Sequence, residues 1–302
     1  MKKFLLILLS LALLAGNTYG RRMASIQVHE WGVLTWSNIA PVLSSIPGTH
    51  PPFIEPVDQG GMLMRAPVLY FHGPEFTGTV TVKTDNGSIF DIYPVLPDMV
   101  REDNMVSWTA KFKYAEIEEY PNFHGMVPGE WNYNLWRVDS PLSIFTADGW
   151  NDKFLYYETA PVTTSFLPYT TGQETLCEEY ENIEVIIIKP DGENSFFMRC
   201  YLSDLVEGRG ADTYPVTSDA IVGILYEWSA ELLEFEETDA LWATWSDWMS
   251  EGYKDESTYA DGFVLYMIPE ELTNNFSEIS VETLSPSYPV NTSRFLLVAM
   301  PL

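Results

Sequence analysis

The stretch TVTVKTDNGSIFDIYP, residues 79–94, decides the predicted fold of this chain. Apolar and polar residues alternate on both sides of the triplet Asp85, Asn86 and Gly87, and this alternation is typical of strands that bury one face. Asn and Gly tolerate the positive φ angles of a tight turn. The stretch therefore predicts two strands joined as a β-hairpin.

Similar short runs rich in Val, Ile and aromatic residues recur between clusters of turn residues, which is typical of a β-dominated fold. A second hairpin is expected from the runs 185–188 and 196–201, which flank the turn residues Pro190, Asp191 and Gly192. The other expected strands are 26–36, 66–72, 106–114, 134–138, 154–157, 263–268, 279–284 and 295–300.

The segment 217–252 differs, because its apolar residues recur at helical spacing. We expect one helix capped by Ser218 or Asp219, and a second that opens at Thr238 or Asp239 and ends at Gly252. The predicted fold class is α+β: a mainly antiparallel β-sandwich with a C-terminal helical hairpin packed on the sheet.

The first 20 residues, MKKFLLILLSLALLAGNTYG, have two lysines before a short apolar run and small residues after it, as secretory signal peptides do. We expect cleavage after Gly20 and a periplasmic or secreted protein. Residues 21–302 are predicted to form a single β-rich domain, with a weak sub-boundary within 160–182. After cleavage no stable membrane insertion is expected, because the apolar run is shorter than the roughly 20 residues that span a bilayer.

The chain is strongly acidic, with 16 Lys and Arg against 43 Asp and Glu and a net charge of −27. Such a surface repels phosphate backbones, so nucleic acid is excluded as a partner. The acidic residues predict a solvated surface or weak binding of divalent cations.

Cys177 and Cys200 are the two cysteines of the chain. In an oxidising compartment two cysteines more often pair than stay free, so a structural disulfide between them is expected. The bond requires residues 178–182 to fold back, because the hairpin places Cys200 near Glu184.

The segment VHEWGVLTW, Val28 to Trp36, raises the question of whether His29 and Glu30 act together. Val33 stands where a zincin helix has its second histidine, so that motif is excluded. In a strand His29 shares a face with Trp31, while Glu30 points to the opposite side. We expect Glu30 to face Arg65 on a neighbouring strand. His29, Glu30 and Arg65 are the candidate catalytic residues.

All four histidines, His29, His50, His72 and His124, lie in the first half of the chain. No motif requires a cofactor, but His29, His72 and His124 are candidate ligands of a divalent metal if the fold brings them together. The alternative, which the pattern favours, is that His29 and His72 are hydrogen-bonded core or rim residues. His72 is expected to share a strand face with Val68 and Tyr70.

Many tryptophans accompany tyrosines and carboxylates, as on sugar-binding surfaces, although such residues also fill large β cores. The tryptophans concerned are Trp31, Trp36, Trp108, Trp131, Trp136 and Trp150.

Several short motifs occur in a distinctive order, among them HEWG at 29–32, RAPVLYFH at 65–72, NLWRVDS at 134–140, TWSDWMSEG at 244–252 and LYMIP at 265–269. Together they resemble a family of exported bacterial proteins of unknown function that share an HEWGT-type opening. This chain departs from that pattern at Val33 and at His72. The resemblance implies export and a shared fold, and it brings no mechanism.

The sequence predicts an exported β-rich binding or structural module, with carbohydrate as one ligand class. The alternative is a periplasmic hydrolase, metal-assisted or acid–base, that uses histidine and glutamate residues of the N-terminal half. An aromatic groove would favour the module, and a polar pocket around His29, Glu30 and Arg65 would favour the enzyme.

Overall fold

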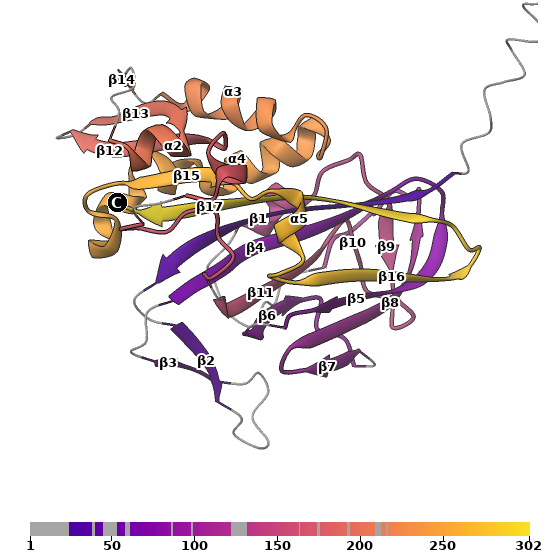
Figure 1. The fold of residues 1–302 in the computed structure, drawn as a ribbon. Coiled ribbons are helices and arrows are strands. Elements are labelled where there is room, and N and C mark those ends of the chain that lie inside the picture. The colour runs from indigo at the N-terminus through magenta and orange to yellow at the C-terminus, as the bar shows by residue number, and fades with distance from the viewer. Residues whose placement is uncertain are drawn as a thin grey trace, which may run out of the picture.

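The computed structural model describes residues 24–37, 40–44, 53–57, 61–85, 87–97, 99–121, 132–162, 164–173, 176–191, 194–208, 213–215 and 217–302. The chain is mostly β, with 44% in strands, and its sheets are rich in antiparallel pairs (Figure 1). This agrees with the predicted β-rich α+β class. The predicted signal peptide lies outside the described residues.

The largest element is a nine-stranded sheet with the order β14-β13-β12-β15-β17-β1-β4-β11-β6. Strands β1 and β17 pair in parallel, and the other neighbours in this sheet pair antiparallel. Its strands are β1 (Ile26–Ser37), β4 (Gly61–His72), β6 (Ser88–Tyr93), β11 (Leu155–Val162), β12 (Glu184–Asp191), β13 (Asn194–Tyr201), β14 (Thr213–Pro215), β15 (Phe263–Met267) and β17 (Val290–Pro301).

A second sheet has the order β10-β9-β8-β5-β16, with β7 also paired to β8. Its strands are β5 (Phe76–Lys83), β7 (Val100–Glu102), β8 (Met105–Lys113), β9 (Ser143–Phe145), β10 (Asn151–Asp152) and β16 (Glu278–Ser285). Strands β2 (Ala40–Ser44) and β3 (Phe53–Val57) pair with each other.

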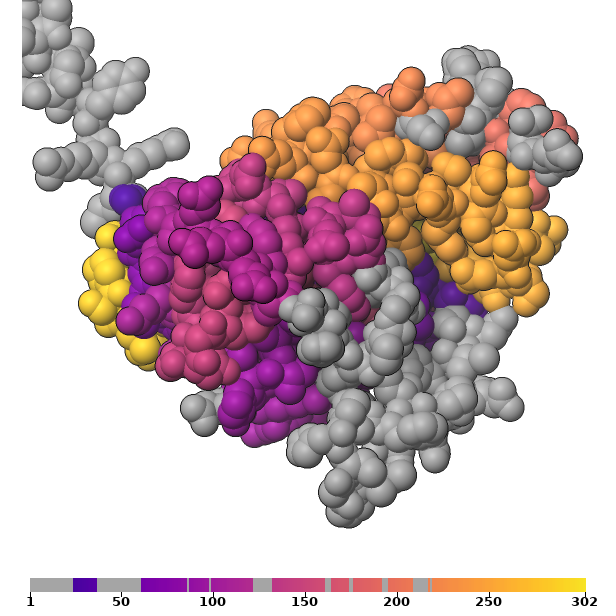
Figure 2. Space-filling view, turned by 180° about the vertical axis from the view of Figure 1, so that it is seen from behind, coloured from indigo at the N-terminus to yellow at the C-terminus, as the bar shows by residue number. Residues whose placement is uncertain are grey.

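Helices cluster in the C-terminal half. The two longest are α3 (Ser218–Ser229) and α4 (Phe235–Ser250), and Figure 2 shows their segment in orange beside the magenta residues of the N-terminal half. The short helices are η1 (Tyr133–Trp136), η2 (Glu178–Tyr180), α2 (Leu202–Val206), η3 (Gly252–Asp255), η4 (Ser257–Tyr259) and α5 (Glu270–Thr273). None of the helices among the described residues is long and apolar enough to cross a membrane.

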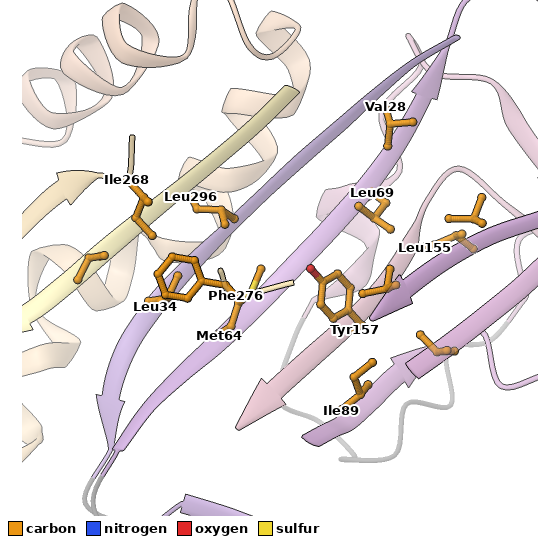
Figure 3. Packing of buried hydrophobic residues seen from close by; sticks show 14 of the residues in the cluster. Val28, Leu34, Met64, Leu69, Ile89, Leu155, Tyr157, Ile268, Phe276 and Leu296 are labelled. Atoms are coloured by element: carbon orange, nitrogen blue, oxygen red, sulfur yellow. The ribbon is translucent and has the colours of Figure 1, made fainter. Parts of the chain in front are cut away.

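Two large apolar clusters lie on the two faces of the nine-stranded sheet. The first joins this sheet to the second sheet and contains Val28, Leu34, Leu155 and Tyr157, shown in Figure 3. The second contains side chains of β1, β4 and β17 together with those of α3 and α4. Both faces of the central strands are therefore buried, which explains their high content of apolar residues.

Strand β1 sends alternate side chains to the two clusters. Val28 and Leu34 belong to the first, whereas Trp31 and Val33 belong to the second. His29 is on the helix side, because it shares the alternation of Trp31.

A bulge sets the orientation of the end of β4. Met64 lies in the first cluster, but Ala66 and Tyr70 lie in the second, so the strand changes face between residues 64 and 66. The change occurs at Ala66, whose φ is +48°, opposite a register shift in β1. Regular alternation from Met64 would have placed His72 on the opposite side of the sheet from helix α4. The bulge thus brings His72 to the helix side.

Glu30 points to the first cluster and is fully buried. Its register partner is Arg294 on β17, whose Nε donates to Glu30 Oε2 at 2.5 Å. The Tyr157 hydroxyl donates to Glu30 Oε1, and Arg294 also donates to the backbone oxygen and hydroxyl of Ser277. The predicted pairing of Glu30 with Arg65 is therefore wrong, because the strand beside Glu30 on this face supplies Arg294.

The predicted hairpin over 79–94 is also wrong, although both of its strands exist. Strand β5 pairs with β8 and β16, and β6 pairs with β11 in the other sheet. The backbone N–H of Thr84 donates to Asn104, and that of Ile89 donates to Asp103. The turn therefore carries the chain from one sheet to the other, and Gly87 still adopts a positive φ of 95°.

Two further expectations about local structure need correction. The predicted strand 134–138 is instead the 3-10 helix η1, where Trp136 is buried. Helix α4 begins at Phe235, earlier than predicted, because Glu234 and Glu237 form a capping box. The cap of α3 is Thr217, whose hydroxyl accepts from Ala220 N–H.

The predicted disulfide is absent, and both cysteines are free. Strands β12 and β13 pair as predicted, and Cys200 stands opposite Val185. Residues 178–180 form the turn η2, and residues after β13 bond back to Glu181 and Ile183. Cys177 precedes this whole turn, so it does not return to the hairpin position of Cys200.

We expect Arg294→Met to lower the free energy of unfolding by about 3–5 kcal/mol, because it leaves the buried Glu30 carboxylate without its cation. The double variant Glu30→Leu/Arg294→Met should recover most of this loss, since Tyr157 and Ser277 still bond each other. Urea unfolding of both variants measures the difference. A single-variant cost below about 1 kcal/mol would contradict this role of the ion pair.

The free thiols can be distinguished by alkylation of native protein. Burial, with the nearby charge of Asp204, raises the pKa of Cys200 to about 11, and Cys177 is exposed. At about pH 8 iodoacetamide should modify Cys177 first, and Cys200 should react faster as the pH rises, because the thiolate is the nucleophile. Peptide mass mapping follows both sites. Native protein with no reactive thiol would show that the two cysteines are bonded.

Candidate metal centre

Two of the candidate histidines lie next to each other on neighbouring strands. His29 is on β1 opposite Tyr70 of β4, and His72 is on β4 opposite Gln27 of β1. This diagonal places both imidazoles on the helix side of the sheet, where their ring centroids are 4.5 Å apart. Their side chains are 11% and 14% exposed, so the pair lies at the edge of the buried region.

Glu237 of helix α4 contacts both imidazoles and is fully buried. Its Oε2 is 2.8 Å from His29 Nδ1, and its Oε1 is 2.7 Å from His72 Nε2. The backbone N–H of Glu234 also donates to Glu237 Oε2 at 2.9 Å. One carboxylate thus joins two strands to the first turn of a helix.

The electrostatics keep this carboxylate ionised. Burial alone would raise the pKa of Glu237, but the hydrogen bonds and charges of His29 and His72 bring the pKa below its usual range. The position in the first turn of α4 acts in the same direction, because helix N-termini favour negative charge. Burial, together with the Glu237 charge, holds the pKa of the nearby Tyr70 hydroxyl well above its ordinary value.

The three side chains form a donor set that suits a transition metal. One ligand atom from each of His29, His72 and Glu237 lies within 4.8 Å of the other two. Two imidazole nitrogens and a carboxylate oxygen are ligands of zinc and of neighbouring divalent metals. Ligand atoms in a tetrahedral zinc site lie about 3.3 Å apart. Ion entry would therefore separate each imidazole from its carboxylate oxygen by about 0.5 Å, and the two imidazole nitrogens, which lie within 4.8 Å of each other, would have to reach the same spacing.

A loop next to this cluster is tied to the same helix turn. The backbone N–H groups of Asp139 and Ser140 donate to Glu236 Oε2, both at 3.1 Å. Lys153 Nζ donates to the backbone oxygens of Asp139 and Pro141. The two adjacent glutamates of α4 thus have different partners: Glu236 accepts hydrogen bonds from the loop, and Glu237 contacts the two imidazoles.

The other predicted site residues do not join the cluster. Glu30 points to the opposite face and pairs with Arg294. Arg65 donates from Nε to Glu158 Oε1 at 3.2 Å, and the same oxygen accepts from the Ala66 N–H. The proposed catalytic trio of His29, Glu30 and Arg65 therefore does not converge. His124, the third candidate metal ligand, lies outside the described residues.

The five candidate tryptophans that the structure describes differ in burial. Trp31, Trp108 and Trp136 are fully buried core residues, Trp36 and Trp150 are half-buried, and Trp131 lies outside the described residues. Three of the five described candidates are therefore core residues, and whether the chain binds carbohydrate stays a prediction.

Glu237 was not among the predicted site residues, although the sequence holds a signal for it. It precedes Leu241 by four residues and Trp245 by eight, which places a carboxylate on the apolar face of the helix. A buried carboxylate requires partners, so this position indicates a site.

Comparison of this chain with models of protein families, with curated proteins and with solved structures finds no match.

We expect Glu237→Ala to lower the free energy of unfolding by about 1–3 kcal/mol, because it removes the helix cap and the partner of both imidazoles. Glu236→Ala is the matched control and should cost less than about 1 kcal/mol, since its bonds are exposed. Thermal unfolding compares the two variants. Equal losses would contradict a special role for Glu237.

Proposed function

We propose that this protein is an exported metal-binding protein in which His29, His72 and Glu237 bind a zinc-type divalent ion. The observation that supports this best is the convergence of the three ligand atoms within 4.8 Å, from two strands and a helix. Positions 29, 72 and 237 are far apart in the chain, so their convergence depends on the complete fold.

The charge balance favours a cation at this place. The carboxylate of Glu237 is fully buried, and the partners it contacts are the two imidazoles and the backbone N–H of Glu234. A divalent ion would neutralise this charge and satisfy three ligands together. The acidic chain, with its net charge of −27, would also attract cations toward the site.

Metal-assisted hydrolysis is the second candidate function. A His₂Glu ligand set is also found in catalytic zinc sites, where a water occupies the remaining position and becomes a nucleophile. We place binding first because the other predicted catalytic residues, Glu30 and Arg65, are engaged in ion pairs away from the cluster.

Other parts of the proposal rest on the sequence. A periplasmic or secreted location follows from the signal-like N-terminus, and kinship with the HEWGT-type family follows from the ordered motifs. We also propose that the two main sheets form a sandwich, with α3 and α4 as a helical hairpin on the large sheet. The two apolar clusters support this arrangement.

The test is elemental analysis of protein purified without chelators and then equilibrated with zinc. Wild-type protein should retain about one zinc per chain. His29→Ala and His72→Ala should each lose most of the zinc, because each variant removes one of the imidazole ligands. Glu236→Gln is the control and should keep the metal.

Each variant must first show an unchanged circular dichroism spectrum. Wild-type protein without zinc, or histidine variants that retain the wild-type amount, would overturn the proposal. In that case the cluster is a hydrogen-bonded link between sheet and helix.

A further inference from the structure

A pocket far from the histidines opens where the parallel strands β1 and β17 end. Because β1 and β17 run in the same direction, their carboxyl ends lie at the same end of the sheet. Thr35 of β1 stands opposite Ala299 of β17, and the next residues, Trp36 and Met300, line the pocket. Its volume is about 350 Å³, within the usual range of about 300–1,000 Å³ for small-molecule sites.

The lining of this pocket combines one aromatic ring with several hydroxyl groups. Besides Trp36 and Met300, it contains Thr164, Thr170, Thr171 and Thr258. The threonines come from two separate segments, the loop 164–173 and the helix η4. The Thr171 hydroxyl donates to the backbone oxygen of Pro301, whereas the hydroxyls of Thr164 and Thr170 can both donate and accept, so the lining suits a ligand that has both functions.

Among the residues that the structure describes, no charged side chain lines the pocket. A charged ligand would therefore leave water without a compensating partner, which is costly. The chain's net charge of −27 further disfavours anions. These two facts select a neutral polar ligand over a phosphate or carboxylate ligand.

Trp36 is held in place at the pocket wall. Its backbone N–H donates to the Tyr259 hydroxyl at 2.6 Å, and that hydroxyl donates to Ala299 O at 3.1 Å. Within the described part of the chain, the indole N–H of Trp36 has no hydrogen-bond partner, so it is available to a ligand. The bonds through Tyr259 anchor the backbone of Trp36, and its indole has a flat apolar face and a polar edge, which match the apolar face and hydroxyl rim of a pyranose ring.

We propose that this pocket binds a neutral pyranose sugar, with Trp36 against the ring and threonine hydroxyls bonded to its rim. The site uses none of the proposed metal ligands. The test of sugar binding is therefore independent of the test of zinc binding.

The experiment measures binding of methyl glucopyranoside, methyl galactopyranoside, methyl mannopyranoside and N-acetylglucosamine by saturation-transfer NMR, followed by calorimetric titration of the best ligand. At least one neutral sugar should bind. Trp36→Leu and Thr170→Val should each raise its dissociation constant by about tenfold or more, which is the effect expected from the loss of one contact. Thr79→Val changes a half-buried threonine of β5 whose hydroxyl bonds Thr109; it is the matched control and should leave binding unchanged.

Melting temperatures of all variants must stay close to that of wild type, and Thr170→Val keeps the test valid if Trp36→Leu does not fold. Absence of binding by every neutral sugar would overturn the proposal. Unchanged affinity in both pocket variants, or tighter binding of glucose 6-phosphate than of glucose, would overturn it as well.

Discussion

Strand β1 is buried on both faces, and this constraint governs the polar chemistry of the molecule. A buried polar group is costly unless a partner satisfies it. His29 and Glu30 stand side by side in the chain, so each had to find its partner on a different side of the sheet. Glu30 bonds Arg294 and Tyr157 on the face of the first apolar cluster, and His29 contacts Glu237 of α4 on the other face. His29 and Glu30 are therefore adjacent in the sequence but belong to two separate sites on opposite faces of β1.

The two sites differ in what they can do. The Glu30 site is closed: its cation is 3% exposed and bonds Glu30, Asn274 and Ser277, as expected for a structural ion pair. The Glu237 site contains an ionised carboxylate with two imidazoles at a partly exposed edge. Gly32, the last residue of HEWG, lies against β4, where a Cβ would come within 3.2 Å of Pro67 Cα. The HEWG motif thus supplies one residue to each polar site, His29 and Glu30, and a glycine that allows close contact with β4.

The sequence could predict the parts that depend on local pattern. Alternation correctly placed His29 with Trp31, and His72 with Tyr70, because strand periodicity fixes faces. It could not predict partners, since Arg294 and Glu237 are more than 200 residues from β1 and only the sheet order selects them. The same limit explains the wrong hairpin over 79–94: its turn residues allow a tight turn, but β8 and β11 compete as partners of its strands. The disulfide was expected because the chain has two cysteines and an export signal. Neither feature could predict the turn η2, which Cys177 precedes.

The central claim is that an ion replaces the hydrogen bonds among His29, His72 and Glu237. The most direct measurement is a crystal structure of zinc-equilibrated protein with anomalous scattering recorded on both sides of the zinc absorption edge. We expect one strong peak at about 2.0 Å from His29 Nδ1, His72 Nε2 and a Glu237 oxygen, with the imidazoles moved away from the carboxylate. Imidazoles that remain hydrogen-bonded to Glu237 with no peak between them, or a peak bound by other residues, would contradict the account.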